Sequence, residues 1–316
     1  MPVTTRSSER KILLIDTGCC SLNEAIVEEG RSKGIYVEVA YHGNNMKKVS
    51  DYVLRKAAGF AAVCIYENKE ISKEQVEILK ENGNKFILCC SEGFENVPVE
   101  ACEAAGIQVA RVWEKSPPSI AEYAIACVFG LAKNLRNRTA LRCDRTNAAN
   151  ISVQELESLL LENKTVGVIG TGIVGQCFAK KMSGLVGEVI CYDKFPNNEW
   201  IKELPNGRYV NNLDELLANA DIISIHMPLL PETRHLINEE TLKKMKDRVI
   251  IVNTSRGEMV SHGDLLMAIR SGKVGGAAFH AVPPFHPSYN DLRELAAQGN
   301  VFLSGYLAFW PTDECP

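Results

Sequence analysis

The chain has 316 residues, of which 46% are hydrophobic, so it is long enough for about two domains of ~150 residues with full cores. Its net charge of -4 and its pI near 6.0 argue against non-specific binding to nucleic acid. No apolar run reaches the ~18 residues that a membrane-spanning helix needs, and residues 1–10 are polar and lack an apolar signal core. We therefore expect a cytoplasmic protein that contacts neither membrane nor nucleic acid directly.

The 11 cysteines do not form the pattern of a disulfide framework. Their number is odd, no pair has Cys-x-x-Cys spacing, and several lie in apolar runs, among them Cys64, Cys89, Cys90 and Cys191. Such residues are typical of reduced, mostly buried thiols in the cytoplasm. The sequence also contains no zinc-ligand spacing, so no metal site is predicted.

The first third of the chain alternates short apolar runs with helical patterns. Strands are expected at residues 11–16, 37–40, 61–66, 86–90 and 108–112. Helices are expected at residues 22–34, 46–58 and 72–83, the last with Ser72 as its N-cap and Gln75 completing a capping box. This alternation predicts a parallel sheet with helices on its faces.

A proline-containing stretch, Ser116-Pro117-Pro118-Ser119, interrupts this pattern and marks the expected domain border. The helix expected at residues 119–135 is small and apolar on nearly every side. A helix of this kind is buried, either in a domain core or between domains or subunits. Both readings, a core helix and a dimer element, remain open.

The central stretch of the chain reads strand, glycine turn, helix, strand and then an acid. The apolar run Val166 to Ile169 leads into Gly170-Thr171-Gly172-Ile173-Val174-Gly175. Gly170 would allow a tight turn, Gly172 would let the backbone approach a pyrophosphate, and Gly175 would let the helix pack closely on the sheet. The N-terminus of that helix would offer backbone N–H groups and a positive dipole end to the phosphates.

An acid follows at the end of the next apolar run, residues 189–192. Asp193 lies 18 residues after Gly175, where a carboxylate can accept hydrogen bonds from adenosine ribose hydroxyls. A carboxylate there repels a 2′-phosphate, so the sequence predicts NAD or NADH rather than NADP. The alternative is a glycine turn in an ordinary parallel-sheet protein that binds nothing.

The alternation continues after Asp193. Residues 221–228 are expected to form a strand running into a turn, and residues 249–257 a strand ending at a charged turn. Further strands are expected at residues 274–280 and 301–303, and helices at 213–217, 238–245 and 261–271. Together with the glycine turn, this predicts a second parallel-sheet domain of the Rossmann type.

Several longer motifs follow one another in a fixed order along the chain. They are Gly93-Phe94-Glu95-Asn96, Ala121-Glu122-Tyr123-Ala124, Gly170 to Gly175, Asp221 to Pro228, Pro231 to Asn238, Val252 to Gly257 and Ala308-Phe309. In these motifs the chain resembles the D-isomer-specific 2-hydroxyacid dehydrogenases, and most closely the D-lactate dehydrogenase branch. The resemblance implies a substrate domain built from residues 1–111 plus 305–316 and a Rossmann NAD-binding domain of residues 112–304 inserted in it. It also implies a homodimer and a small 2-oxo or 2-hydroxy acid as possible ligand.

The motifs and the resemblance together assign the cofactor site. The expected cofactor-binding residues are Gly170, Thr171, Gly172, Ile173, Val174, Gly175, Asp193, His226, Met227, Pro228, Thr254, Ser255, Arg256 and His280.

The resemblance also implies three catalytic groups: an arginine that clamps the substrate carboxylate, a histidine that exchanges a proton with the substrate, and a glutamate that holds this histidine. Arg256 occupies the arginine position. Pro283 stands at the glutamate position and Tyr306 at the histidine position. His280 replaces an aspartate and is a possible substitute for the missing proton carrier.

Three functions fit these residues. The first is an NAD(H)-binding sensor or regulatory pseudoenzyme, and the second is an active oxidoreductase on an altered 2-oxo or 2-hydroxy acid, with a proton relay rebuilt from Tyr306 or His280. The third is a structural subunit with a vestigial nucleotide site. The glycine turn favours the first two, and the replaced histidine and glutamate favour the first over the second. Glu92 and Lys115 favour the second, because a changed pocket can serve a changed ligand; whether the protein is an enzyme stays open.

Overall fold

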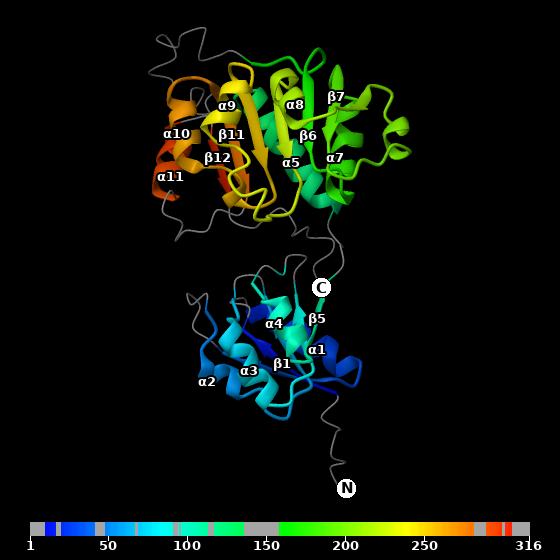
Figure 1. Cartoon of the computed structure of the whole chain (residues 1–316), viewed down its shortest axis with the longest axis vertical. Helices are drawn as coiled ribbons and strands as arrows, with labels where there is room; N and C mark the ends of the chain where they lie inside the picture. The colour runs from blue at the N-terminus through cyan, green and yellow to red at the C-terminus, as the bar shows by residue number, and fades with distance from the viewer. Residues whose placement is uncertain are drawn as a thin grey trace. The chain divides into compact units, whose positions relative to one another are not determined.

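The computed structural model describes residues 10–16, 20–41, 48–66, 69–90, 94, 96–112, 117–135, 158–280, 289–298 and 301–304. The chain divides between Lys115 and Ser116 into two compact units. Each unit is a parallel sheet with helices against it, so the predicted α/β class with two parallel-sheet domains is confirmed (Figure 1).

The first unit is built on a five-stranded parallel sheet in the order β2-β1-β3-β4-β5. Its strands are β1 (Lys11–Ile15), β2 (Tyr36–Ala40), β3 (Ala62–Ile65), β4 (Phe86–Cys89) and β5 (Gln108–Arg111). This 2-1-3-4-5 order is that of flavodoxin-like doubly wound sheets. The strands are apolar because helices cover both faces of such a sheet, and Leu13, Val63 and Ile87 have no exposed surface.

Four helices of this unit are described. They are α1 (Cys20–Ser32), α2 (Asp51–Arg55), α3 (Lys73–Glu81) and α4 (Val99–Ala104). The capping box predicted for α3 is confirmed, with the Ser72 backbone N–H donating to Gln75 Oε1 at 3.0 Å. The helix predicted at residues 46–58 is too long, because Lys48 instead forms a parallel bridge with Glu70 and Ser50 caps the start of α2.

The second unit is built on a seven-stranded parallel sheet in the order β12-β11-β10-β9-β6-β7-β8. Its strands are β6 (Thr165–Ile169), β7 (Glu188–Tyr192), β8 (Gly207–Tyr209), β9 (Ile222–Ile225), β10 (Val249–Asn253), β11 (Val274–His280) and β12 (Val301–Ser304). The chain winds from β6 to one side through β7 and β8, and then crosses to β9 on the other side. In sheets of this kind a ligand binds at the carboxyl ends of the strands, where the order reverses, here between β6 and β9.

Helices cover both faces of this sheet (Figure 1). They are α5 (Pro117–Ala132), α7 (Ile173–Ser183), α8 (Leu213–Asn219), α9 (Glu239–Lys244), α10 (His262–Arg270) and α11 (Tyr289–Gln298), with single turns η4 (Trp200–Glu203) and η5 (Gly257–Met259). Helix α5 packs on α7, β10 and β11, with Val128 and Phe178 in one apolar cluster. Its buried face therefore belongs to the core of this unit, which is one of the two readings left open by the sequence.

The sequence did not predict β8, α4 or α11. Strand β8 has three residues and lies at the edge of the sheet, so its sequence carries almost no alternating pattern. The strand running into a turn that the sequence predicts at residues 221–228 is confirmed: β9 ends at Ile225, and His226 follows it. Among the helices described, none is long and apolar enough to cross a membrane.

Candidate cofactor site

The glycine turn joins β6 to α7 through two close backbone contacts. Gly170 has a φ of +91°, and a Cβ on it would lie 2.8 Å from the backbone carbonyl of His226. A Cβ on Gly175 would lie 2.0 Å from the Gly170 oxygen. Real Cβ atoms do not come this close, so only glycine at both positions lets the helix start directly above the strand end.

The second glycine faces open space. A Cβ on Gly172 would meet no atom within 4 Å. Gly172 is the N-cap of α7, whose first backbone N–H groups have no acceptor within the helix. Thr171 and Ile173 flank it, and Gln176 Nε2 donates to the Thr171 carbonyl at 2.9 Å, which fixes the turn. An open backbone surface at a helix N-terminus fits a diphosphate group.

Asp193 follows β7 and is held by the glycine turn. Its Oδ2 accepts from the Thr171 backbone N–H at 2.6 Å and from Thr171 Oγ1 at 3.1 Å, and its Oδ1 accepts from the Phe195 N–H at 2.8 Å. A carboxylate has about four acceptor positions, so these bonds leave capacity for a ribose hydroxyl. Tyr209 of β8 adds a hydroxyl contact of 2.8 Å with Thr171 Oγ1, a contact that nothing in the local sequence indicated.

His226 is the first residue after β9 and lies beneath the turn. Its Nε2 is 2.8 Å from Ser224 Oγ, its Nδ1 is 3.5 Å from Thr254 Oγ1, and its ring centroid is 4.9 Å from that of Phe178. Although the residue as a whole is only half-buried, its ring is enclosed by these neighbours, and this burial lowers the pKa of His226 to about 3. The imidazole is therefore neutral at pH 7, so the side chain beneath the glycine turn is polar but uncharged.

The turn after β10 carries Arg256. Asn253, with no exposed surface, donates from Nδ2 to the Arg256 carbonyl at 2.8 Å and accepts from the Ser255 N–H at 3.0 Å. Ser255 Oγ donates to the Ile225 carbonyl at 3.1 Å, which ties this turn to the end of β9. The Arg256 side chain is half-buried, and its Nη1 donates to the Ser255 carbonyl at 3.3 Å. The sequence named Arg256 but did not reveal that Asn253 holds its backbone.

The other predicted residues lie at the same edge or outside the described residues. Val174 is in the first turn of α7, and Met227 and Pro228 follow His226, with Thr233 Oγ1 donating to the Pro228 carbonyl at 2.9 Å. His280 ends β11, where its backbone pairs with Ser304 of β12. The residues that fall outside the described part of the chain are Glu92, Gly93, Glu95, Lys115, Ser116, Pro283, Tyr306, Ala308 and Phe309.

These positions converge because parallel strands end at one edge. The ends of β6, β7, β9, β10 and β11 bring together residues that are more than a hundred positions apart in the sequence. Within the described ranges, no group of three or more His, Cys, Asp or Glu side chains is arranged to hold a metal ion.

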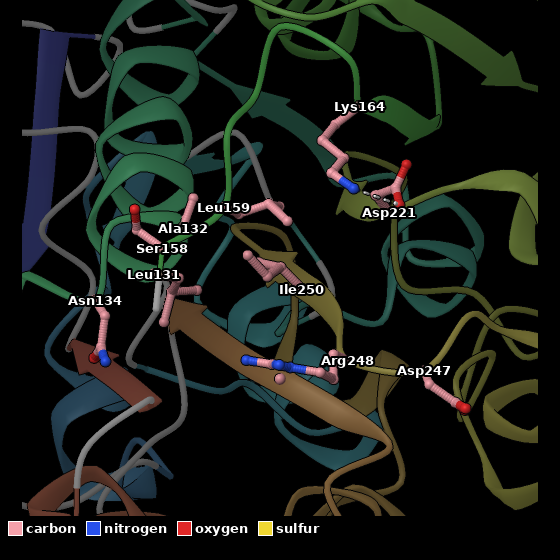
Figure 2. Close-up of a pocket in the computed structure, with 11 residues that line it drawn as sticks. Leu131, Ala132, Asn134, Ser158, Leu159, Lys164, Asp221, Asp247, Arg248 and Ile250 are labelled. Atoms are coloured by element: carbon pink, nitrogen blue, oxygen red, sulfur yellow. Dashed lines mark ion pairs between the residues drawn. The ribbon is translucent and has the colours of Figure 1, made fainter. Parts of the chain in front are cut away.

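A pocket of about 370 Å³ lies at the opposite edge of this sheet (Figure 2). It is lined by residues that precede strands, among them Lys164 before β6, Asp221 before β9 and Arg248 before β10, together with the end of α5. The Lys164 ammonium and the Asp221 carboxylate point toward each other across 3.7 Å (Figure 2). Because the glycine turn is at the other ends of these strands, this pocket is not the cofactor site.

The order of strands, the glycine turn and the acid after β7 define a dinucleotide-binding α/β protein. Residues 125–308 match the family described as D-isomer specific 2-hydroxyacid dehydrogenase, NAD binding domain. The chain belongs to this family, and its second unit is the NAD-binding domain.

Known proteins of this family match most of the chain. It is 33% identical to the D-lactate dehydrogenase of Escherichia coli over 272 residues, 83% of this chain and 80% of that protein. It is 35% identical to a 2-hydroxyacid dehydrogenase homolog of Zymomonas mobilis over 275 residues, 83% of this chain and 81% of that protein. The crystal structure of D-lactate dehydrogenase from Aquifex aeolicus complexed with NAD and lactic acid aligns with a TM-score of 0.81 at 28% identity, covering 95% of this chain and 89% of that one.

Proposed function

We propose that the protein binds NAD(H) at the carboxyl edge of the seven-stranded sheet, that it lacks the ordinary proton relay of its family, and that it acts as a nucleotide-dependent sensor or regulatory protein. The observation that carries the binding proposal is the glycine turn. Gly175 lies so close to the Gly170 oxygen that a Cβ on it would be only 2.0 Å away, whereas a Cβ on Gly172 would meet no atom within 4 Å. The tight turn and the open backbone at Gly172 together fit a dinucleotide diphosphate.

Different residues of this edge would bind different parts of the nucleotide and the substrate. The N–H groups of Gly172, Ile173 and the rest of the first turn of α7 would face the diphosphate, and Asp193 would accept from the adenosine ribose. Arg256 would pair with a substrate carboxylate through its guanidinium fork. Bound NADH supplies a hydride to a carbonyl carbon. The protein must then supply a proton to the carbonyl oxygen.

The proton supply is the step that we propose to be impaired. Pro283 has no ionisable group, and Tyr306 has an unperturbed pKa of ~10, several units above neutral pH. A general acid works best when its pKa is close to the working pH, and losing one typically lowers the rate ~10²–10⁴-fold. We therefore expect nucleotide binding to persist while the oxidation of NADH by a 2-oxo acid is weak or absent.

The test is NADH oxidation, followed at 340 nm, with a panel of 2-oxo acids that includes pyruvate, in a sample whose NADH binding is measured first by intrinsic fluorescence. The expected result is binding without a fall in absorbance. Rapid oxidation with any member of the panel would overturn the impaired relay. The double variant Pro283→Glu, Tyr306→His is the positive control. It restores the family's glutamate and histidine, so it should oxidise NADH faster than the parent.

A second candidate is an active oxidoreductase in which His280 supplies the proton. The observation that favours it is the backbone position of His280, at the end of β11 beside the strand whose turn carries Arg256. Histidine has an unperturbed pKa of ~6.5, which suits proton transfer at neutral pH. If the panel yields a substrate, His280→Gln should abolish its turnover, and Tyr306→Phe serves as the matched test of the other position.

Three further expectations belong to the same proposal: a cytoplasmic protein, a homodimer, and a first domain that includes residues 305–316. They rest on the resemblance within the family. Since the apolar face of α5 is covered by α7, β10 and β11, this helix alone does not require a partner. Sedimentation equilibrium of the full chain distinguishes monomer from dimer.

A further inference from the structure

Two thiols of the first unit lie unusually close to each other. Cys64 is on β3, Cys90 directly follows β4, and their Sγ atoms are 2.9 Å apart. The sheet itself sets this separation. Cys64 is in register with Leu88, and the Cys90 N–H donates to the Ile65 carbonyl at 2.8 Å, so both backbones are fixed by the ladder between β3 and β4.

The separation is short enough for a covalent bond after a small movement. A disulfide has an S–S length of ~2.05 Å, so closure needs less than ~1 Å of approach, within the range of side-chain rotation. The neighbouring Cys89 packs in the apolar core of this unit, because successive residues of a strand point to opposite faces. Cys90, not Cys89, is therefore the residue paired with Cys64.

The two thiols differ in exposure and acidity. Cys64 is 7% exposed, whereas Cys90 is half-buried. The hydrogen bond from the Cys64 thiol lowers the pKa of Cys90, and the same bond together with burial raises the pKa of Cys64. The thiolate, which is the reactive form, is thus favoured at the more accessible sulfur.

We propose that Cys64 and Cys90 form a reversible dithiol–disulfide site at the carboxyl edge of the five-stranded sheet, oxidised by a peroxide. Both sulfur atoms belong to the first unit, whereas the glycine turn belongs to the second.

The chemistry balances in two steps. The Cys90 thiolate attacks one oxygen of hydrogen peroxide, the O–O bond breaks, and Cys90 becomes a sulfenic acid with release of one water after protonation. The Cys64 sulfur then attacks the sulfenic sulfur, the S–O bond breaks, and a second water leaves. Two thiols and one peroxide thus give one disulfide and two waters, and a small dithiol such as dithiothreitol reverses the change by thiol–disulfide exchange.

The bond would constrain a long segment of chain. It joins residues 26 positions apart and links the residue that follows β4 covalently to β3. Because such a cross-link restricts the unfolded chain more than a sheet that is already formed, the oxidised protein should unfold a few degrees higher than the reduced protein.

The test uses the full chain, reduced and then treated with hydrogen peroxide, alkylated, digested with trypsin without reductant and examined by mass spectrometry. The expected product links the peptide of residues 57–69 to that of residues 86–111, and dithiothreitol abolishes it. Cys90→Ser and Cys64→Ala should each lose this product. Cys177→Ser, which changes another half-buried thiol, on α7, is the matched control and should keep it.

Two outcomes would overturn the proposal. One is a linked peptide that persists in Cys90→Ser, which would place the bond at Cys89 or Cys102. The other is oxidation of Cys90 to its sulfinic acid while Cys64 remains open to alkylation. Cys90→Ser keeps the experiment decisive even if Cys64→Ala does not fold, because residue 90 lies outside the apolar core.

Discussion

The carboxylates at the two edges of the seven-stranded sheet have different partners: lysines at the amino edge, and N–H and hydroxyl groups at the carboxyl edge. At the amino edge, Asp221 lies 3.1 Å from Lys246 and 3.7 Å from Lys164, and it accepts from the Thr165 N–H at 3.0 Å. At the carboxyl edge, Asp193 is bonded to N–H and hydroxyl groups of the glycine turn, and His226 is neutral. The ion pair Lys194–Glu232 near that edge spans 3.8 Å between mostly exposed side chains.

This difference assigns stability to one edge of the sheet and nucleotide binding to the other. Paired charges at the amino edge tie together the segments that precede β6, β9 and β10. At the carboxyl edge, backbone N–H groups at the start of α7 can donate to a diphosphate without an ion pair being broken first. Substitutions at the two edges should therefore have separable effects on stability and on nucleotide binding.

The largest effect is expected for Gly175→Ala, which breaks the carboxyl edge itself. The new Cβ would lie 2.0 Å from the Gly170 oxygen, so helix or strand must move. We expect a loss of about 3 kcal/mol in the free energy of unfolding and a more than tenfold weaker affinity for NADH. Thermal unfolding and NADH titration measure the two losses.

Gly184→Ala is the control for that change. Gly184 caps the other end of α7 with a φ of -79°, and a Cβ there would meet no atom within 4 Å. Both stability and affinity should stay close to those of the parent. An equal loss in the two variants would contradict the role of the glycine turn.

A smaller effect is expected at the amino edge for Asp221→Asn. The amide keeps the shape of the side chain but loses the charge that Lys164 and Lys246 share, and Asp221 is mostly buried, with a side chain 20% exposed. We expect a loss of about 1–2 kcal/mol in unfolding free energy and no change in NADH affinity. Asp214→Asn, at an exposed pair with Lys244, should cost less than ~0.5 kcal/mol. Weaker NADH binding in Asp221→Asn would contradict the separation of the two edges.

A pH effect of similar or smaller size is expected from His226. Burial lowers its pKa from 6.5 to about 3, so between these values the unfolded chain binds one proton more than the native chain. Stability should therefore fall as the pH falls from 6.5 toward 3, by roughly 1–2 kcal/mol between pH 6.5 and 5. Chemical denaturation at both pH values, for the parent and His226→Gln, measures the change. The same pH slope in both proteins would rule out His226 as its source.

Local signals predicted the parts of the site that depend on neighbours in sequence. The glycine turn and Asp193 were found because strand, turn, helix and acid follow one another within residues 164–194. Ser224, Asn253 and Tyr209 were missed, because their roles arise only when β9, β10 and β8 take their places in the sheet. The helix predicted at residues 46–58 starts too early for the same reason, since the bridge between Lys48 and Glu70 joins distant parts of the chain and α2 begins at Asp51.

The most direct test of the account is NADH titration of the parent, Gly172→Asp and the matched control Gly184→Asp. Gly172 faces open space at the N-cap of α7, so aspartate there can be accommodated and can cap the helix, but its carboxylate would repel a diphosphate. The account predicts that Gly172→Asp binds NADH at least tenfold more weakly than the parent, with an unchanged unfolding temperature, while Gly184→Asp binds normally. Equal affinity in all three proteins would contradict nucleotide binding at this edge.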